Sequence, residues 1–201
     1  MKLDIVHDLQ SVYRKIVDAS ARPGQLADLT KDACFVKEEG NHDCPASILL
    51  LALTLFDQEI TFKVISEKEE NITKTINQLT YAKPVETEDA DYILILQDAE
   101  VGALNNAIEI AKPGTLKNPH SSATIIVEVS EVSDEPSLRL KGPGIQAIEF
   151  AHVETNEKWV ESRQMKNIEY PLGIEMMFVD HQAQLLSLPR TTQITENRVI
   201  V

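Results

Sequence analysis

Residues 92–96, Tyr-Ile-Leu-Ile-Leu, are apolar at five consecutive positions, and this run limits the fold more than any other feature. A strand with one face in water alternates apolar and polar residues, whereas a strand covered on both faces has no polar positions. The run therefore predicts a central strand of a sheet that has other elements packed on each face. A chain of 201 residues can supply such a core, and we expect residues 1–201 to form one domain.

Helical and strand patterns alternate through the first half of the chain. The patterns predict an amphipathic helix over 5–16, a helix buried nearly all round over 48–56, a strand over 61–65, a helix opened by a capping box of Ser66 and Glu69, and a helix over 101–111. This alternation is typical of α/β proteins, in which helices cover a sheet.

Strand-rich segments dominate the second half. Residues 123–129 and 138–140 flank an acidic turn at 134–136, which predicts an antiparallel pair. Helical character returns over 156–165, and residues 174–179 and 185–188 form a second predicted hairpin. The expected fold is therefore a three-layer α/β/α sandwich with a mixed central sheet.

The net charge of −13 limits the classes of ligand. Nucleic acid and anionic membranes would be repelled, so any phosphate ligand needs a locally basic site. We interpret the acidic stretches 67–70 and 128–135 as solvated surface. The longest apolar run, residues 48–56, is too short to cross a bilayer, and the amino terminus does not resemble a signal peptide, so we expect a cytoplasmic protein.

Catalytic and metal motifs are absent from the sequence. It contains no G-x-S-x-G, no Walker loop, no H-E-x-x-H and no G-x-G-x-x-G. Cys34 and Cys44 are too few for a disulfide framework or a zinc site. The histidines show no metal-ligand spacing; they are His7, His42, His120, His152 and His181. We therefore assign no catalytic residue and no metal ligand.

Two short segments combine cations with groups that can hold an anion. Arg139 and Lys141 adjoin Gly142-Pro143-Gly144, whose backbone amides could cradle a phosphate, although Pro-Gly is also ordinary type II turn chemistry. Residues 188–192, Leu-Pro-Arg-Thr-Thr, place the Arg190 guanidinium beside two hydroxyls, and the competing interpretation is a loop capped by threonine hydroxyls.

Five segments, in this order and with these separations, resemble the H-subunit family of the bacterial carbon-phosphorus lyase system. They are Tyr13-Arg14 with Ala19 and Arg22-Pro23-Gly24; Gly114-Thr115 through Pro119 into 123–126; 138–145, Leu-Arg-Leu-Lys-Gly-Pro-Gly-Ile; 170–174, Tyr-Pro-Leu-Gly-Ile; and 188–192. Two positions depart from the family pattern. The family usually has Phe at Tyr13 and Asp at Glu175, and the longer Glu175 side chain puts any role carried over for that carboxylate in doubt.

The resemblance implies a fold similar to the large domain of PLP-dependent aspartate-aminotransferase-like proteins, without PLP or another cofactor. It implies a homodimer that works with carbon-phosphorus lyase subunits G, I and J in phosphonate metabolism. The G, H and I subunits, with the L protein, displace adenine from ATP by a phosphonate, which is the α-D-ribose 1-methylphosphonate 5-triphosphate synthase step. Cleavage of the carbon-phosphorus bond belongs to the J subunit.

Three functional hypotheses follow. The chain is a subunit of that multi-subunit transferase, with no activity alone; or a purely structural assembly subunit with no ligand site; or an independent small-molecule enzyme. For the first, we expect Arg14, Arg139, Lys141 and Arg190 to form an anionic-ligand site for nucleotide or phosphonate. We expect dimerisation to cover an exposed edge or face at 174–178.

Overall fold

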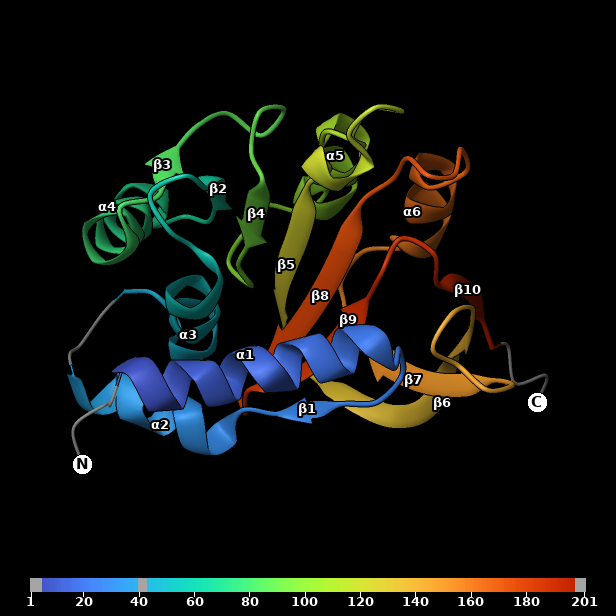
Figure 1. Cartoon of the computed structure of the whole chain (residues 1–201), viewed down its shortest axis with the longest axis horizontal. Helices are drawn as coiled ribbons and strands as arrows, with labels where there is room; N and C mark the ends of the chain where they lie inside the picture. Colours follow the sequence, from blue (N-terminus) through green and yellow to red (C-terminus); the bar gives the residue numbers. More distant parts are fainter. Residues whose placement is uncertain (1–4, 40–42, 198–201) are drawn as a thin grey trace.

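The computed structural model describes residues 5–39 and 43–197. Its centre is a seven-stranded sheet in the order β1-β9-β8-β5-β4-β2-β3 (Figure 1). The strands are β1 (Ala27–Asp28), β2 (Thr61–Ile65), β3 (Lys83–Pro84), β4 (Tyr92–Ile95), β5 (Thr124–Val129), β8 (Glu175–Asp180) and β9 (Gln184–Leu188). Along the sheet, each neighbouring pair in the order β3-β2-β4-β5-β8 is parallel, while β9 is antiparallel to both β8 and β1. The predicted α/β class and mixed sheet are confirmed.

Side chains alternate across the sheet, so each face has its own hydrophobic cluster. On β4, Leu94 points into one cluster, while Ile93 and Ile95 point into the other, and all three are buried. The consecutive apolar run therefore corresponds to an internal strand, as predicted.

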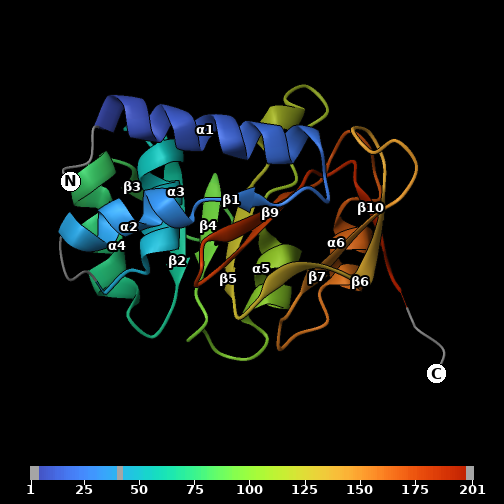
Figure 2. The same cartoon turned by 90° about the horizontal axis from the view of Figure 1, so that it is seen from below.

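Four helices cover the first face: α1 (Ile5–Ala21), α2 (Thr30–Glu39), α3 (Ala46–Leu55) and α4 (Glu69–Thr80). Figure 2 shows α1 running along this side of the molecule, past α3 and towards β1 and β9. Residues 47–52 of α3 are all buried, because the helix lies between the sheet and the other helices. The predicted helix without a polar face is confirmed.

The second face is covered by α5 (Ala103–Ile110), α6 (Val160–Lys166) and a small antiparallel sheet in the order β10-β6-β7. The small sheet consists of β6 (Val132–Lys141), β7 (Glu149–Val153) and β10 (Gln193–Glu196). Trp159 packs its ring on Phe178 of the central sheet, with ring centroids 4.6 Å apart. This layer thus contains a sheet as well as helices, which the predicted sandwich lacks.

The predicted antiparallel pairing of residues 123–129 with 138–140 is wrong. β5 lies between β4 and β8, and β6 pairs only with β7 and β10. Residues 134–136 form no turn between strands, because β6 passes through them with a register shift between Ser133 and Leu138. The reason is burial: Ile125–Val127 is buried at every position and needs neighbours on both faces, whereas β6 alternates and can leave one face in water.

The expected exposed face at 174–178 is also wrong. β8 is an internal strand with β5 on one side and β9 on the other. Ile174, Met176 and Phe178 have no exposed surface. A second copy therefore cannot cover this segment.

Local corrections concern the helices. The Ser66–Glu69 capping box is wrong, because Ser66 Oγ accepts from the Lys68 amide at 3.0 Å while the Glu69 carboxylate pairs with Lys63 at 2.7 Å. The sequence patterns missed α2, whereas the hairpin of β8 and β9 is confirmed. None of the described helices is long and apolar enough to span a membrane.

Candidate functional site

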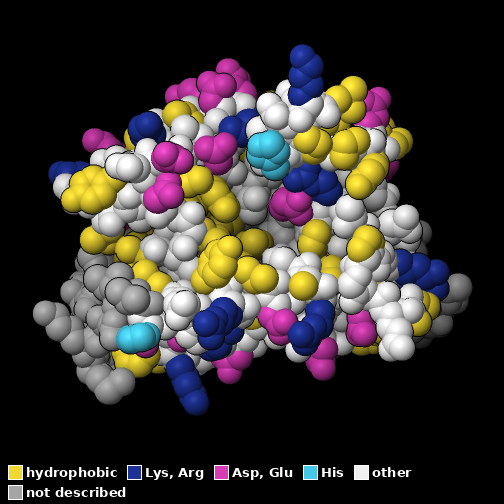
Figure 3. Space-filling model, viewed as in Figure 1, with side chains coloured by type: hydrophobic (Ala, Val, Ile, Leu, Met, Phe, Trp, Pro, Cys, Tyr) yellow, Lys and Arg dark blue, Asp and Glu magenta, His cyan; other side chains and the backbone are white. Residues whose placement is uncertain are grey.

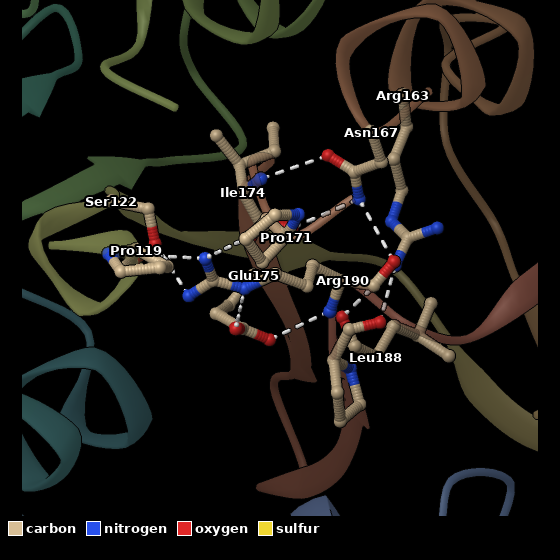
Figure 4. A network of polar contacts seen from close by, with 10 residues as sticks. Pro119, Ser122, Arg163, Asn167, Pro171, Ile174, Glu175, Leu188 and Arg190 are labelled. Atoms are coloured by element: carbon tan, nitrogen blue, oxygen red, sulfur yellow. Dashed lines mark hydrogen bonds and ion pairs between the residues drawn. The ribbon is translucent and has the colours of Figure 1, made fainter. Parts of the chain in front are cut away.

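Arg190 lies in the loop from β9 to β10, and its guanidinium ties together three other parts of the chain (Figure 4). Nε donates to Glu175 Oε1 at 2.7 Å, and Nη2 donates to Ser122 Oγ at 2.7 Å. Nη1 donates to the carbonyl oxygens of Pro119 and Pro171, at 2.6 and 3.1 Å. Among the described residues only one N–H of Nη2 is left without an acceptor, so Arg190 acts mainly as a brace.

Glu175 is the first residue of β8 and holds Arg190 at two points. Its Oε2 accepts from the Arg190 backbone N–H at 2.7 Å, in addition to the ion pair with Nε. The two side chains are only 28% and 15% exposed, so solvent screens this pair less than a surface pair. Glu175 therefore has a structural partner within the chain.

A second guanidinium, that of Arg163 on α6, supports the same loop from inside. Arg163 is 2% exposed, and it donates to the carbonyl oxygen of Leu188 at 3.2 Å (Figure 4). It also donates to the carbonyl oxygens of Pro189 and Thr192, at 2.7 and 3.0 Å. Burial lowers the pKa of Arg163 to about 10, so it remains charged at neutral pH. The Thr192 hydroxyl is buried and has no partner among the described residues, so the predicted threonine cap is not formed there.

Asn167, just after α6, connects the two arginines to the start of β8. Its Oδ1 accepts from the Ile174 amide at 2.8 Å, and its Nδ2 donates to the carbonyls of Ile174 and Arg190 at 3.1 and 3.4 Å (Figure 4). Gly173 fits beside this amide, since an added Cβ would lie 2.6 Å from Asn167 Oδ1. The loop before β8 is thus fixed by side chains rather than by strand pairing.

The segments that carry the family resemblance contact one another in pairs. Gly142 packs on the loop of Arg190, because an added Cβ would lie 2.8 Å from the Thr191 carbonyl. Gly144 packs even more closely on the carbonyl of Ala21, and the Gly173 amide donates to the Pro113 carbonyl at 2.9 Å. The Arg190 loop and the loops before β5 and β8 thus form one junction at the amino-terminal ends of these two strands.

The four predicted ligand-binding cations do not meet in one place. Arg14 is exposed on α1, and Arg190 is held by the junction. Arg139 and Lys141 are two residues apart on β6, so they share one face of the small sheet. Neither has an ion-pair partner among residues 5–39 and 43–197. The structure thus brings together two of the four.

Comparison with known proteins identifies the family. Residues 3–195 match the family described as "Bacterial phosphonate metabolism protein (PhnH)". The chain belongs to the PhnH family. The resemblance seen in the five segments is therefore confirmed, and it places the chain in phosphonate metabolism.

Two relatives of this PhnH family member cover nearly the whole chain. A Stutzerimonas stutzeri protein named as a C-P lyase subunit, HtxG, is 27% identical over 188 residues, 92% of this chain and 85% of that protein. The "Alpha-D-ribose 1-methylphosphonate 5-triphosphate synthase subunit PhnH" of Rhizobium meliloti (strain 1021) is 28% identical over 193 residues, 95% of this chain and 92% of that protein.

This PhnH family member also has a crevice at the carboxyl ends of β2, β4 and β5, where ligands bind in many open α/β sheets. Two adjoining cavities of ≈ 260 and ≈ 520 Å³ share Ala99 to Val101 and Ala103. Acidic side chains line them, including Glu69, Glu100 and Glu128. Burial, and then the nearby Asp98, raise the pKa of Glu128. None of the described residues that line this crevice is a cation, so it does not suit a phosphate or phosphonate.

The Glu157 carboxylate binds at the amino terminus of α5, beside that crevice. Its carboxylate accepts from the amides of Gly102, Leu104 and Asn105 at 2.9, 3.2 and 3.1 Å, and from Asn105 Nδ2 at 2.8 Å. These groups form the amino terminus of α5, which favours an anion through its unpaired N–H groups and dipole. The chain therefore fills this position with its own carboxylate.

An exposed apolar patch lies next to the Arg190 junction. We define it by Ile110, Leu116, Met165, Ile168 and Tyr170, which are between 40% and 78% exposed. The bonds from Arg190 to the loops before β5 and β8, and from Lys166 Nζ to the Glu109 carbonyl at 2.7 Å, hold these segments side by side. Figure 3 shows hydrophobic side chains gathered over the end of α5 and the following loop. Exposed apolar groups at this density mark interaction surfaces.

The described part of the chain contains no cluster of metal ligands. Burial raises the pKa of the Cys44 thiol to about 12, which makes it unreactive. His152 Nδ1 lies 2.8 Å from Ser137 Oγ, His181 Nδ1 lies 3.2 Å from the Ser130 carbonyl, and His42 falls outside the described residues. Sequence reasoning missed Arg163 and Glu157, whose partners are mostly backbone groups that leave no sequence pattern.

Proposed function

We propose that the chain is a cytoplasmic subunit of a carbon-phosphorus lyase complex, in which it supports transfer of a phosphonate onto the ribose of ATP with loss of adenine. The family match and the names of the two relatives support this proposal. Subunits G, I and J are the expected partners. A purely structural assembly subunit is the alternative function.

The observation that carries the proposal is the exposed apolar patch. Leu116 and Tyr170 are 76% and 78% exposed, on loops that Arg190 holds in place. A preformed surface of this kind pays little ordering entropy when it is covered by a partner. We assign the patch to another subunit of the complex rather than to a second copy. Lys117 is exposed beside Leu116 and has no partner among the described residues, so an apolar surface with an acidic rim would fit.

Co-expression with subunits G, I and J tests this assignment. Leu116→Ser with Tyr170→Ser should abolish co-purification without lowering the melting temperature, because both side chains already lie in water. Tyr81→Ser is the matched control, since Tyr81 is 74% exposed on the other side of the sheet from α5, at the end of α4. Full assembly of the double variant with the other subunits would contradict the assignment. If light scattering shows the wild-type chain to be a dimer and the variant remains a dimer, a second copy does not bind at the patch.

Activity should require the complex. The purified chain alone should release no adenine from ATP and methylphosphonate, whereas the assembled subunits with the L protein should. Turnover by the chain alone would favour an independent enzyme. We also retain the proposals of a single domain over 1–201, a homodimer, and an aminotransferase-like fold without PLP; light scattering that shows only monomer would contradict the homodimer.

The predicted anionic-ligand site is reduced from four cations to two. Arg190 has partners for nearly all of its donors, whereas Arg139 and Lys141 share a face and have no ion-pair partner in the part of the chain that the structure describes. We therefore propose Arg139 and Lys141 as the cations that meet nucleotide or phosphonate. Arg14 and Arg190 would then affect the ligand only indirectly.

A further inference from the structure

A cavity of ≈ 830 Å³ opens between the loop after α1 and the small sheet. Residues 22–26 form one wall, the start of β6 and of β7 form the opposite wall, and Gln184 of β9 contributes from the central sheet. This volume lies within the range of small-molecule sites, roughly 300–1,000 Å³. The cavity also lies between two of the family segments, because Gly144 and Gly24 both line it.

Four uncharged side chains that can form hydrogen bonds line the cavity, beside three charged ones. Gln25, Gln146 and Gln184 each bring an amide, which can donate and accept, although the Gln25 oxygen already accepts from Arg22 Nη1 at 3.3 Å. The Ser133 hydroxyl has no partner among the described residues, and Phe150 adds an apolar group that is 38% exposed. Amides with an aromatic side chain suit a flat, polar, uncharged ligand such as a nucleobase with its ribose.

The charges in the lining argue against a phosphate inside the cavity. Asp134 and Glu149 are acidic, and Arg22 is already paired with Asp18 at 2.8 Å. A polyphosphate would therefore be repelled from the interior and would need a basic surface next to it.

Such a surface adjoins the cavity on the small sheet. Arg139 is the direct cross-strand partner of Phe150, so the two side chains lie on the same face. Lys141 is on this face too, and it immediately precedes the turn that brings Gly144 to the cavity. The cavity and these two cations are thus neighbours.

We propose that this cavity binds the nucleoside part of ATP and that Arg139 and Lys141 bind its phosphates. The inference rests on the proposed function, because that function supplies ATP as the nucleotide. It goes further by assigning the adenosine end to a defined cavity, away from the Arg190 junction and the carboxyl-end crevice.

Calorimetric titration of the purified full chain with ATP and with adenosine tests the proposal. ATP should bind, and adenosine should compete with it. Phe150→Ala and Gln146→Ala should weaken both ligands. Arg139→Ala with Lys141→Ala should weaken ATP by about tenfold or more and leave adenosine unchanged, since only ATP has phosphates.

Matched controls separate binding from folding. Ile148→Ala removes an apolar side chain of similar exposure that does not line the cavity, and Lys83→Ala removes an exposed cation from β3 at the far edge of the central sheet. Neither should change the affinity for ATP. Absence of ATP binding, failure of adenosine to compete, or unchanged ATP affinity in Phe150→Ala would each overturn the proposal.

The two proposals fail in different ways. If the chain alone binds no ATP but supports adenine release in the assembled complex, the cavity assignment falls and the proposed function stands. If the chain binds both ligands as expected but does not assemble with G, I and J, the subunit function falls instead.

Discussion

One carboxylate, that of Glu175, holds both the side chain and the backbone of Arg190. Oε1 accepts from Nε and Oε2 from the backbone N–H, each at 2.7 Å. The guanidinium continues from there to Ser122 and to the carbonyls of Pro119 and Pro171. An arginine that the sequence suggests as a ligand group is therefore a brace that positions the loops beneath the apolar patch.

Glu175→Ala should lower the free energy of unfolding by about 1.5–3 kcal/mol, the cost of losing hydrogen bonds to a charged group in a partly buried place. Urea denaturation measures it. Asp43→Ala is the control, because its ion pair with Lys68 is exposed to solvent and should contribute less than the pair of Glu175 with Arg190. Equal losses in the two variants would show that the Glu175 carboxylate is not a brace.

Gly142→Ala should destabilise the protein by more than about 2 kcal/mol. The residue has φ 143°, and an added Cβ would meet the Thr191 carbonyl at 2.8 Å, so strain and a clash add together. Gly102→Ala is the matched control, since Gly102 also has a positive φ, 96°, but an added Cβ would have nothing within 4 Å. This variant should lower the free energy of unfolding by about 1 kcal/mol. Thermal and urea unfolding should rank the two variants in this order, and the reverse order would refute the packing of 142 on the Arg190 loop.

Glu157→Ala should cost about 1–2 kcal/mol, because the first amides of α5 lose their acceptor and the helix dipole loses an anion. Glu157→Gln should lower the free energy of unfolding by less, since the amide oxygen still accepts hydrogen bonds. A smaller loss remains because the amide carries no charge. Glu88→Ala, at an exposed position, is the control. A Glu157→Ala variant as stable as this control would mean that the carboxylate contributes nothing to α5.

Glu128→Gln should stabilise the protein at pH 7. Burial raises the pKa of Glu128, so the folded state disfavours the ionised carboxylate. The cost of ionising Glu128 in the folded state is absent below the unfolded pKa of about 4.3, grows as the pH rises from there to the folded pKa, and is constant above the folded pKa. Unfolding free energies measured from pH 4 to 8 should show the advantage of the variant growing with pH. Exposed Glu131→Gln should show no such trend, and a constant difference for Glu128→Gln would contradict the shift.

Segments with a strong local period were predictable from sequence. The strand over 61–65 begins and ends as expected, and the apolar run at 92–96 contains β4. Helices α1 and α3 and the hairpin of β8 and β9 also follow their patterns. Strands β1 and β3 were not predictable, because two residues are too short for a period.

The candidate site shows the same division. Local chemistry correctly marked 138–145 and 188–192 as segments that carry cations, glycines and hydroxyls. It could not show that Arg190 faces Glu175, or that Arg163 reaches carbonyls 25 to 29 positions away. Every residue has a backbone carbonyl, so no pattern of residue types predicts which carbonyl an arginine will contact.

What the sequence by itself determined is thus the α/β class, the position of the most strongly periodic elements and the family, because periodicity and ordered motifs are properties of the chain. Only the tertiary structure decided which strands pair and which cations are free. β5 and β6 follow each other in the sequence but belong to different sheets. Arg139 and Arg190 look alike in the sequence, yet Arg139 has no ion-pair partner among the described residues, whereas all but one of the Arg190 guanidinium N–H groups have acceptors. The physical reason is that strand pairing and charge pairing both depend on what packing brings alongside, and burial makes an unpaired polar group costly enough to select the partner.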